Sequence, residues 1–113
     1  MGLDFSHGEA HWAYSGFMRF RARLAEHEGF DLRKMQGFDG SRSWDAVTTP
    51  IKPLLDHSDC DGELTPEECA QVYPRLREIL ADWPEDDYDT RAGRELAEAM
   101  LECSATGENL EFC

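Results

Sequence analysis

The strongest constraint on the fold is a segment in the middle of the chain that carries clear start and stop signals for a helix. Thr65 and Glu68 form a capping box, in which each side chain accepts a hydrogen bond from the backbone N–H of the other residue. Pro66 follows at the first helical position, and Trp83-Pro84 ends the helix. Pro74, inside the segment, predicts a kink or a split. The apolar residues expected on the buried face recur at helical spacing: Cys69, Val72, Leu76, Ile79 and Leu80.

Three other segments have helical patterns. Apolar residues from about Trp12 onward fall on one side of a helix, and Gly29 occupies the usual position of a C-terminal glycine. A short helix is expected over residues 50–56. The last helix is expected over residues 88–104, because apolar residues recur there at helical spacing and Gly107 follows as a stop signal.

The remaining segments complete a single domain over residues 1–113. Residues 30–49 are expected to form an irregular loop, since glycine and serine are frequent there. The extended tail, residues 108–113, alternates polar and apolar side chains, and we expect its residues 110–112 to pair with residues 61–64 as a minimal two-stranded sheet. The predicted fold is therefore mainly α, a small domain of three to five helices.

The composition of the chain limits the classes of function that it can have. The chain has 113 residues with 41% hydrophobic residues, six Phe, three Trp and three Tyr, which is enough for a compact core. No apolar run is long enough to cross a membrane. We find no basic start followed by an apolar stretch, so we expect a cytoplasmic protein rather than a secreted one. The net charge of −13 argues against binding to a nucleic-acid backbone, which requires a basic surface.

The charge is concentrated in one half of the sequence. Residues 1–55 carry seven basic and seven acidic residues, whereas residues 56–113 carry four basic and seventeen acidic residues. The acidic residues cluster in two stretches, residues 56–68 and residues 82–89. This distribution predicts an acidic surface with one of three roles. The surface binds cations, docks a basic protein partner or mimics nucleic acid as an inhibitor, or only keeps the protein soluble.

The first acidic stretch contains the most specific motif, His57-Ser58-Asp59-Cys60-Asp61-Gly62-Glu63-Leu64-Thr65-Pro66-Glu67-Glu68. This segment of twelve residues resembles the calcium loop of the EF-hand family. Calcium takes six to eight oxygen ligands, so such a loop needs alternating carboxylates, a glycine that turns the chain and a final acid in the following helix. The resemblance implies a divalent-cation site, with calcium as the ion.

The resemblance also implies a ligand set. The implied ligands are the side chains of Asp59, Asp61, Thr65 and Glu68 and the backbone carbonyl of Glu63. The loop departs from the family at its first position, where His57 replaces an aspartate, and imidazole is a poor ligand for a hard cation. We therefore expect weak calcium binding, in the range of ~10⁻⁴–10⁻³ M. An acidic loop that only caps the following helix is the alternative.

Histidines offer a second metal-site hypothesis. His7 and His11 are four residues apart and would share one face of a helix, although the zinc-hydrolase pattern His-Glu-x-x-His is absent. With His57 and Cys60 they would form a tetrahedral Zn²⁺ site, and a metal-bound water would make the protein a small hydrolase. The alternative is an exposed histidine pair. We expect a binding protein rather than an enzyme and assign no catalytic residue.

The four cysteines have no Cys-x-x-Cys spacing, so a zinc ribbon is not indicated. In a reducing cytoplasm they are expected to be free thiols. Cys69 and Cys103 lie on predicted apolar faces and are interpreted as core residues. Cys60 lies in the polar loop, where its acidic neighbours disfavour the reactive thiolate, and Cys113 ends the chain.

Four short motifs spread over nearly the whole chain are similar to those of a group of short bacterial and phage proteins of uncharacterised activity. The motifs are Gly2-Leu3-Asp4-Phe5-Ser6-His7, Ala13-Tyr14-Ser15-Gly16-Phe17, His57-Ser58-Asp59-Cys60-Asp61-Gly62-Glu63 and Glu108-Asn109-Leu110-Glu111-Phe112. This similarity implies the cytoplasm of a bacterium or of a phage-infected host as the location. It implies no activity.

Overall fold

A computed structural model describes residues 2–58 and 61–113 of the chain. These residues form four α-helices, two short 3-10 helices and two small antiparallel strand pairs, which confirms the predicted mainly α fold. The α-helices are α1 (Tyr14–His27), α2 (Lys52–Leu55), α3 (Pro66–Ala81) and α4 (Tyr88–Thr106). The strands are β1 (Gly2–Leu3), β2 (Trp12–Ala13), β3 (Glu63–Leu64) and β4 (Leu110–Glu111), and the 3-10 helices are η1 (Leu32–Lys34) and η2 (Trp44–Ala46).

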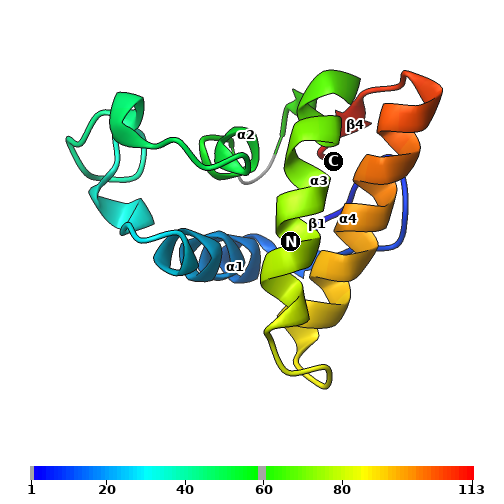
Figure 1. Ribbon diagram of the computed structural model, residues 1–113, viewed down its shortest axis with the longest axis horizontal. Coiled ribbons are helices and arrows are strands. Elements are labelled where there is room, and N and C mark those ends of the chain that lie inside the picture. The colour runs from blue at the N-terminus through cyan, green and yellow to red at the C-terminus, as the bar shows by residue number, and fades with distance from the viewer. Residues whose placement is uncertain (1, 59–60) are drawn as a thin grey trace.

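Helices α3 and α4 lie side by side as an antiparallel hairpin (Figure 1). The predicted capping box at the start of α3 is confirmed: Oγ1 of Thr65 accepts from the backbone N–H of Glu68 at 3.1 Å, and Oε1 of Glu68 accepts from that of Thr65 at 2.9 Å. All five apolar residues predicted for the inner face of α3 are buried. The capping hydrogen bonds therefore fix where α3 begins. Burial of its apolar face fixes how the helix is oriented against the core.

Of the kink or split predicted at Pro74, the split is wrong, because α3 runs from Pro66 to Ala81 as one helix, whereas the kink stays a prediction. Pro74 removes one intrahelical hydrogen bond, which the carbonyl of Ala70 would otherwise accept. Both residues are exposed, so water can hydrogen-bond to that carbonyl. A proline on the solvent side of a well-anchored helix is thus tolerated.

Helix α4 begins and ends near the predicted positions. The side chain of Asp87 accepts from the backbone N–H of Thr90 and caps the first turn. Gly107, with a φ of 76°, ends the helix in the left-handed conformation that favours glycine. The helix continues two residues beyond the predicted end, to Thr106.

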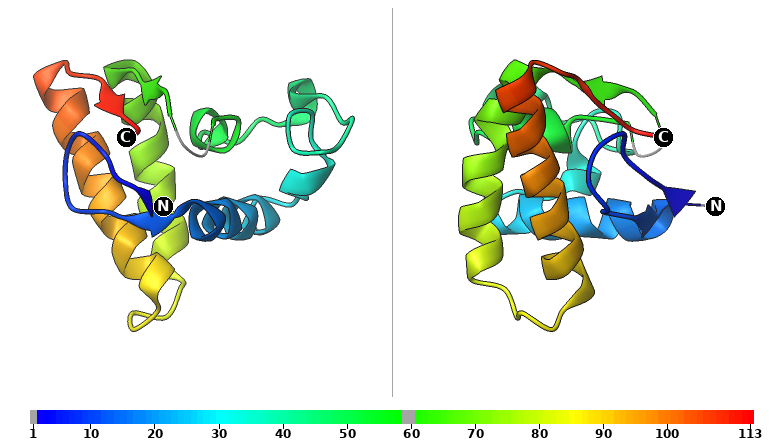
Figure 2. Two further views of the ribbon diagram at one scale, coloured as in Figure 1. Left: turned by 180° about the vertical axis from the view of Figure 1, so that it is seen from behind. Right: turned by 90° about the vertical axis from the view of Figure 1, so that its right-hand side faces the viewer.

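The predicted pairing of the tail is also confirmed. Strand β4 pairs antiparallel with β3, with Glu63 opposite Glu111 and Leu64 opposite Leu110. The pairing of β1 with β2 was not predicted, since two-residue strands are too short for an alternating pattern. The segment between β1 and β2 passes along α4, where Gly8 approaches Ala99 (Figure 2).

Helix α1 runs across the α3–α4 hairpin and leads into the irregular segment 28–51, which extends away from the hairpin (Figure 1). The rings of Phe30, Phe38 and Trp44 pack edge to face within that segment. The main core contains a second aromatic cluster: Phe5, Trp12, Phe17, Phe20 and Phe112. Among the described residues, no helix has the length and apolar character that a membrane span requires.

Candidate functional site

The acidic loop 57–68 connects α2 to α3 and lies against the C-terminal tail. Gly62, the sixth residue of the loop, has a φ of 93°, which side chains other than glycine rarely adopt. Leu64, the eighth residue, is buried within β3. Two residues of the proposed metal sites lie outside the described residues. They are Asp59, predicted as a calcium ligand, and Cys60, predicted as a zinc ligand.

His57 has its imidazole inside the turn of this loop. Its Nδ1 lies 2.8 Å from the carbonyl oxygen of Ser58 and its Nε2 lies 3.0 Å from that of Glu63. The ring stacks on Phe112 with a centroid distance of 4.0 Å. A side chain at Gly62 would meet the ring, because a Cβ there would lie 3.1 Å from Cε1 of His57. The ring of His57 thus bridges the two ends of the loop.

The other proposed calcium ligands have separate contacts. Glu68 and Thr65 bind each other's backbone N–H groups in the capping box, and the side chain of Glu63 accepts a hydrogen bond from Asn109. Asp61 is exposed. Over residues 2–58 and 61–113 the structure contains no group of three or more His, Cys, Asp or Glu side chains placed to hold a metal ion.

Arg21 anchors the beginning of the loop from α1. Its Nη1 donates to the carbonyl oxygens of Leu55 at 3.4 Å and His57 at 2.5 Å. The side chain is buried, with only 1% of the residue exposed, and its guanidinium carbon lies 4.8 Å from the centroid of the Phe17 ring and 5.3 Å from that of Phe38. The sequence pattern does not indicate this role of Arg21. The available signal is its spacing, since Arg21 falls on the same helical face as Phe17, four residues earlier.

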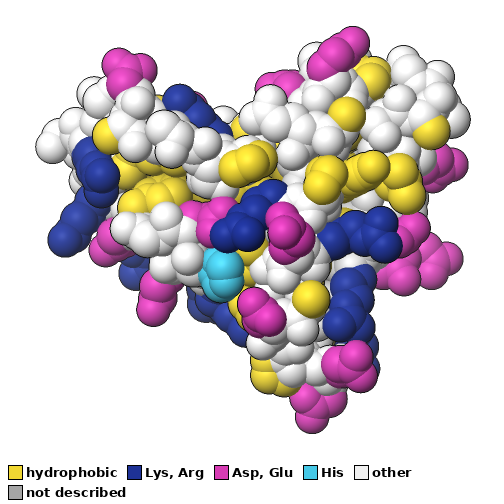
Figure 3. All heavy atoms as spheres, in the orientation of Figure 1, with side chains coloured by type: hydrophobic (Ala, Val, Ile, Leu, Met, Phe, Trp, Pro, Cys, Tyr) yellow, Lys and Arg dark blue, Asp and Glu magenta, His cyan; other side chains and the backbone are white. Residues whose placement is uncertain are grey.

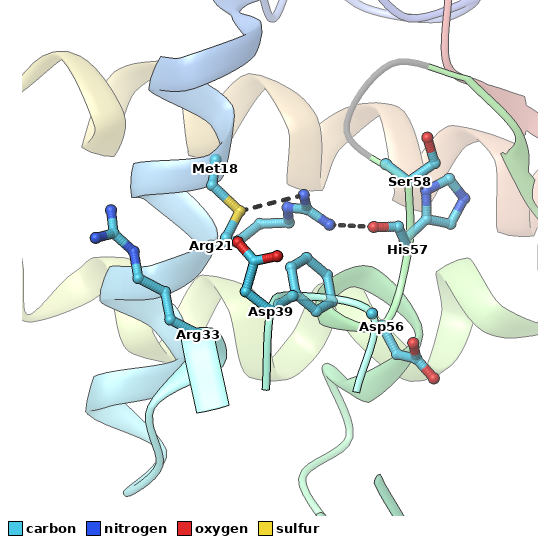
Figure 4. Close-up of a pocket in the computed structure, with 9 residues that line it drawn as sticks. Met18, Arg21, Arg33, Asp39, Asp56, His57 and Ser58 are labelled. Carbon is cyan, nitrogen blue, oxygen red and sulfur yellow. Dashed lines mark hydrogen bonds between the residues drawn. The ribbon is translucent and has the colours of Figure 1, made fainter. Parts of the chain in front are cut away.

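A cleft of about 800 Å³ opens beside Arg21 and the first residues of the loop. Figure 4 shows Met18 and Arg21 extending from α1, with Asp39 of the irregular segment beside them. On the opposite side the backbone carbonyl of His57 faces the guanidinium of Arg21. Asp39 has a φ of 69°, in the left-handed region that aspartate tolerates better than most residues. The cleft brings charges of both signs to the edge of the loop, since Arg21 and Arg33 line it together with Asp39 and Asp56.

The two N-terminal histidines of the zinc hypothesis have different partners. His7 lies 2.8 Å from Oγ of Ser6 and 3.3 Å from Oε1 of Glu108, whereas Nδ1 of His11 lies 2.8 Å from Oδ1 of Asp4. Hydrogen bonds from Thr106 and His7 lower the pKa of Glu108. The described residues therefore do not bring His7, His11 and His57 into one group.

The topology gathers acidic residues at one end of the hairpin. Residues 53–74 and 95–113 contain no Lys or Arg. These two segments include β3, the first half of α3, the second half of α4 and β4, which meet because the helices are antiparallel and the strands pair. We call this region the acidic end. The space-filling view in Figure 3 shows the Lys and Arg side chains of the hairpin below it.

The second acidic stretch, residues 82–89, is partly neutralised within the protein. Nη1 of Arg23 donates to Oδ2 of Asp87 at 2.9 Å and to Oδ2 of Asp89 at 2.8 Å, and its guanidinium lies 3.9 Å from the Trp83 ring centroid. This hydrogen bond from Arg23 lowers the pKa of Asp87. Trp12 also donates to Asp89. The carboxylates of Asp87 and Asp89 thus join α1 to the start of α4.

The cysteines that the structure describes agree with the interpretation of Cys69 and Cys103 as core residues. Neither residue has any exposed surface, whereas Cys113 is exposed, and all three are free thiols. Burial raises the pKa of Cys69 to about 12 and also raises that of Cys103. Neither buried thiol has the thiolate character of a catalytic nucleophile.

No protein-family model matches the sequence, and no curated protein or solved structure is significantly similar to it.

Proposed function

We propose that the protein binds a divalent cation, calcium in the first place, in the loop of residues 57–68. The observation that carries this proposal is the turn at Gly62. Its φ of 93° reverses the chain, and the carbonyl oxygen of Glu63 lies across the loop, 3.0 Å from Nε2 of His57. In an EF-hand-like loop this carbonyl is the seventh-position ligand.

The elements on both sides support the same proposal. The loop enters from α2 and leaves through β3 into α3, with Glu68 in the first turn of that helix. EF-hand loops normally pair with a second such loop, which this protein does not have in its sequence pattern. Here β4 pairs with β3 and supplies the neighbouring strand. Asp61, Glu68 and the Glu63 carbonyl are the described oxygen groups that we assign as ligands, with Asp59 as a further ligand proposed from the sequence.

His57 makes the proposed site weak. Its ring nitrogens lie against two carbonyl oxygens, so an ion that uses the Glu63 carbonyl must displace Nε2 from it. The ring also brings no hard oxygen ligand to the first position. We therefore propose a dissociation constant for calcium of ~10⁻⁴–10⁻³ M, with Zn²⁺ as the alternative ion.

Thermal unfolding with calcium, magnesium, zinc or EDTA tests this proposal. At an ion concentration of about ten dissociation constants, binding to the folded state alone adds roughly 1.4 kcal/mol and raises Tm by several degrees. We expect Asp61→Asn to abolish the shift. The matched control Asp86→Asn also removes an exposed aspartate, outside the loop, and should retain it. An unchanged Tm in millimolar ion, or an equal shift in both variants, would contradict the proposal.

A second candidate function is the docking of a basic protein partner, with mimicry of nucleic acid as one form of it. The specific observation in its favour is the acidic end, where two segments without Lys or Arg meet. Glu95, Glu98 and Glu102 are exposed there on α4, at spacings that place them on one side of the helix. A surface of one charge sign attracts a partner of the opposite sign and speeds its association.

Titration with an oligo-lysine peptide at low and high salt tests the second candidate. We expect salt-sensitive binding that is weakened by the double variant Glu98→Lys/Glu102→Lys. The control Glu85→Lys/Asp86→Lys makes the same charge change in the α3–α4 turn and should affect the affinity less. Equal losses in the two variants would indicate attraction by the net charge alone and would count against a docking surface.

The metal-dependent hydrolase stays a prediction from the sequence, because no contact of His7, His11 or His57 favours it. The cytoplasmic location in a bacterium or a phage-infected host is likewise a proposal. It rests on the similarity of the short motifs to bacterial and phage proteins.

A further inference from the structure

Cys69 and Cys103 lie on neighbouring helices at the acidic end. Cys69 lies in the second turn of α3 and Cys103 lies near the end of α4, and the antiparallel arrangement brings the two positions together. The thiols of Cys69 and Cys103 are close enough for each to affect the pKa of the other, and the backbone of Leu110 in β4 also lies near Cys69. Both residues are fully buried.

We propose that Cys69 and Cys103 form a redox-responsive pair, which a small disulfide such as oxidised glutathione converts to a disulfide bond between α3 and α4. The contact between the side chains carries this inference, because a disulfide forms without backbone movement only between cysteines that are already adjacent. The inference is independent of the proposed cation site, since neither sulfur belongs to its ligand set.

The chemistry is thiol–disulfide exchange. One cysteine, as its thiolate, attacks the small disulfide, forms a mixed disulfide and expels one small thiolate. The second cysteine then attacks the protein sulfur of the mixed disulfide and expels the other small thiolate. The two protons lost by Cys69 and Cys103 end on the two small thiols, so two protein thiols are oxidised and one small disulfide is reduced.

The surroundings set the rate of this reaction. Both thiols are shielded from solvent, and burial holds their pKa values high, so the folded protein reacts slowly. Because β4 covers Cys69, release of the tail is the step that exposes the pair. The bond would then fasten the two helices together beneath the acidic end.

The test uses the full chain with Cys60→Ser and Cys113→Ser, which leaves only the pair. The folded protein is incubated with oxidised glutathione, quenched in acid, denatured, alkylated and weighed by mass spectrometry. We expect the loss of two hydrogens, no alkylated thiol and no attached glutathione. We also expect Tm to rise by roughly 10 °C, since the bond closes the segment from 69 to 103 in the unfolded chain.

Two controls make the result decisive. Adding Cys103→Ala to the same protein should leave a single thiol that is alkylated or carries glutathione. A denatured sample of the two-cysteine protein shows that the incubation is long enough to oxidise accessible thiols. The incubation of the folded protein continues until its thiol content no longer changes. The proposal is overturned if the protein then retains both thiols, carries glutathione on either cysteine, or forms the bond with a lowered Tm.

Discussion

Glu28 follows the last residue of α1 and connects three parts of the chain. Nε and Nη2 of Arg75 donate to its two carboxylate oxygens at 2.9 and 2.7 Å, and the hydroxyl of Thr49 donates at 2.6 Å. Only 6% of its side chain is exposed. These hydrogen bonds, with that of Arg75 dominant over the effect of burial, lower the pKa of Glu28 to about 2 from its usual 4.5.

The pKa shift of Glu28 predicts a pH-dependent contribution to stability. Because the folded state lowers this pKa, the contribution is complete above pH 4.5 and is lost as the pH falls toward 2. We expect Glu28→Gln to lower the free energy of unfolding at pH 7 by about 1–3 kcal/mol and by progressively less below pH 4. Urea denaturation across this range measures the difference. The control Glu26→Gln changes an exposed glutamate two residues earlier, within α1, and should alter the free energy of unfolding by less than about 0.5 kcal/mol throughout this pH range.

His57 is the residue that separates the loop from the EF-hand pattern. Replacing it by aspartate supplies a carboxylate at the first position and removes the ring that contacts the Glu63 carbonyl. We expect His57→Asp to tighten calcium binding at least tenfold in a calorimetric titration. His11→Asp, a histidine outside the loop, is the matched control and should leave the affinity unchanged. Equal or weaker binding by His57→Asp would mean that the loop does not hold calcium as proposed.

At the scale of elements, helix signals proved more informative than strand signals. The capping box at Thr65, the stop at Gly107 and the apolar faces each depend on residues close in sequence, so the helices could be predicted. The pairing of β1 with β2 depends on contacts between distant residues and has no periodic signal. The loop 57–68 could be located from its spacing, whereas the ring of His57 within it and the burial of Arg21 depend on packing.

Pro74 gives a prediction for α3. Substitution by alanine restores a backbone N–H that can bond to the carbonyl of Ala70, without disturbing the core, because position 74 is exposed. We expect Pro74→Ala to raise the free energy of unfolding by about 1–3 kcal/mol, as measured by urea denaturation. A decrease would show that proline stabilises this site by restricting the unfolded chain more than it weakens the helix.

At the scale of the whole molecule, the C-terminal tail joins parts that are distant in sequence. Phe112 contacts the rings of Phe5, Phe17 and His57, and β4 pairs with β3. The tail therefore connects the N-terminal segment, α1 and the acidic loop. The packing of this single residue should determine the stability of the whole domain.

We expect Phe112→Ala to lower the free energy of unfolding by about 3–5 kcal/mol, because its ring is almost completely buried. The neighbouring control Glu111→Ala removes an exposed side chain of β4 and should cost less than about 0.5 kcal/mol. Chemical denaturation monitored by far-UV circular dichroism compares the two. Similar losses in both variants would contradict the assignment of this stability to the ring of Phe112.

Binding of a divalent cation by the loop can be measured by counting bound calcium. Equilibrium dialysis against millimolar calcium, followed by elemental analysis, gives the number of ions per chain for the native protein and for Glu68→Gln. Glutamine preserves the capping box and removes the carboxylate, so helix α3 is retained in the variant. We expect close to one ion per native chain and none specifically bound by Glu68→Gln. Equal amounts of calcium in the two proteins, or none in either, would contradict the proposed binding.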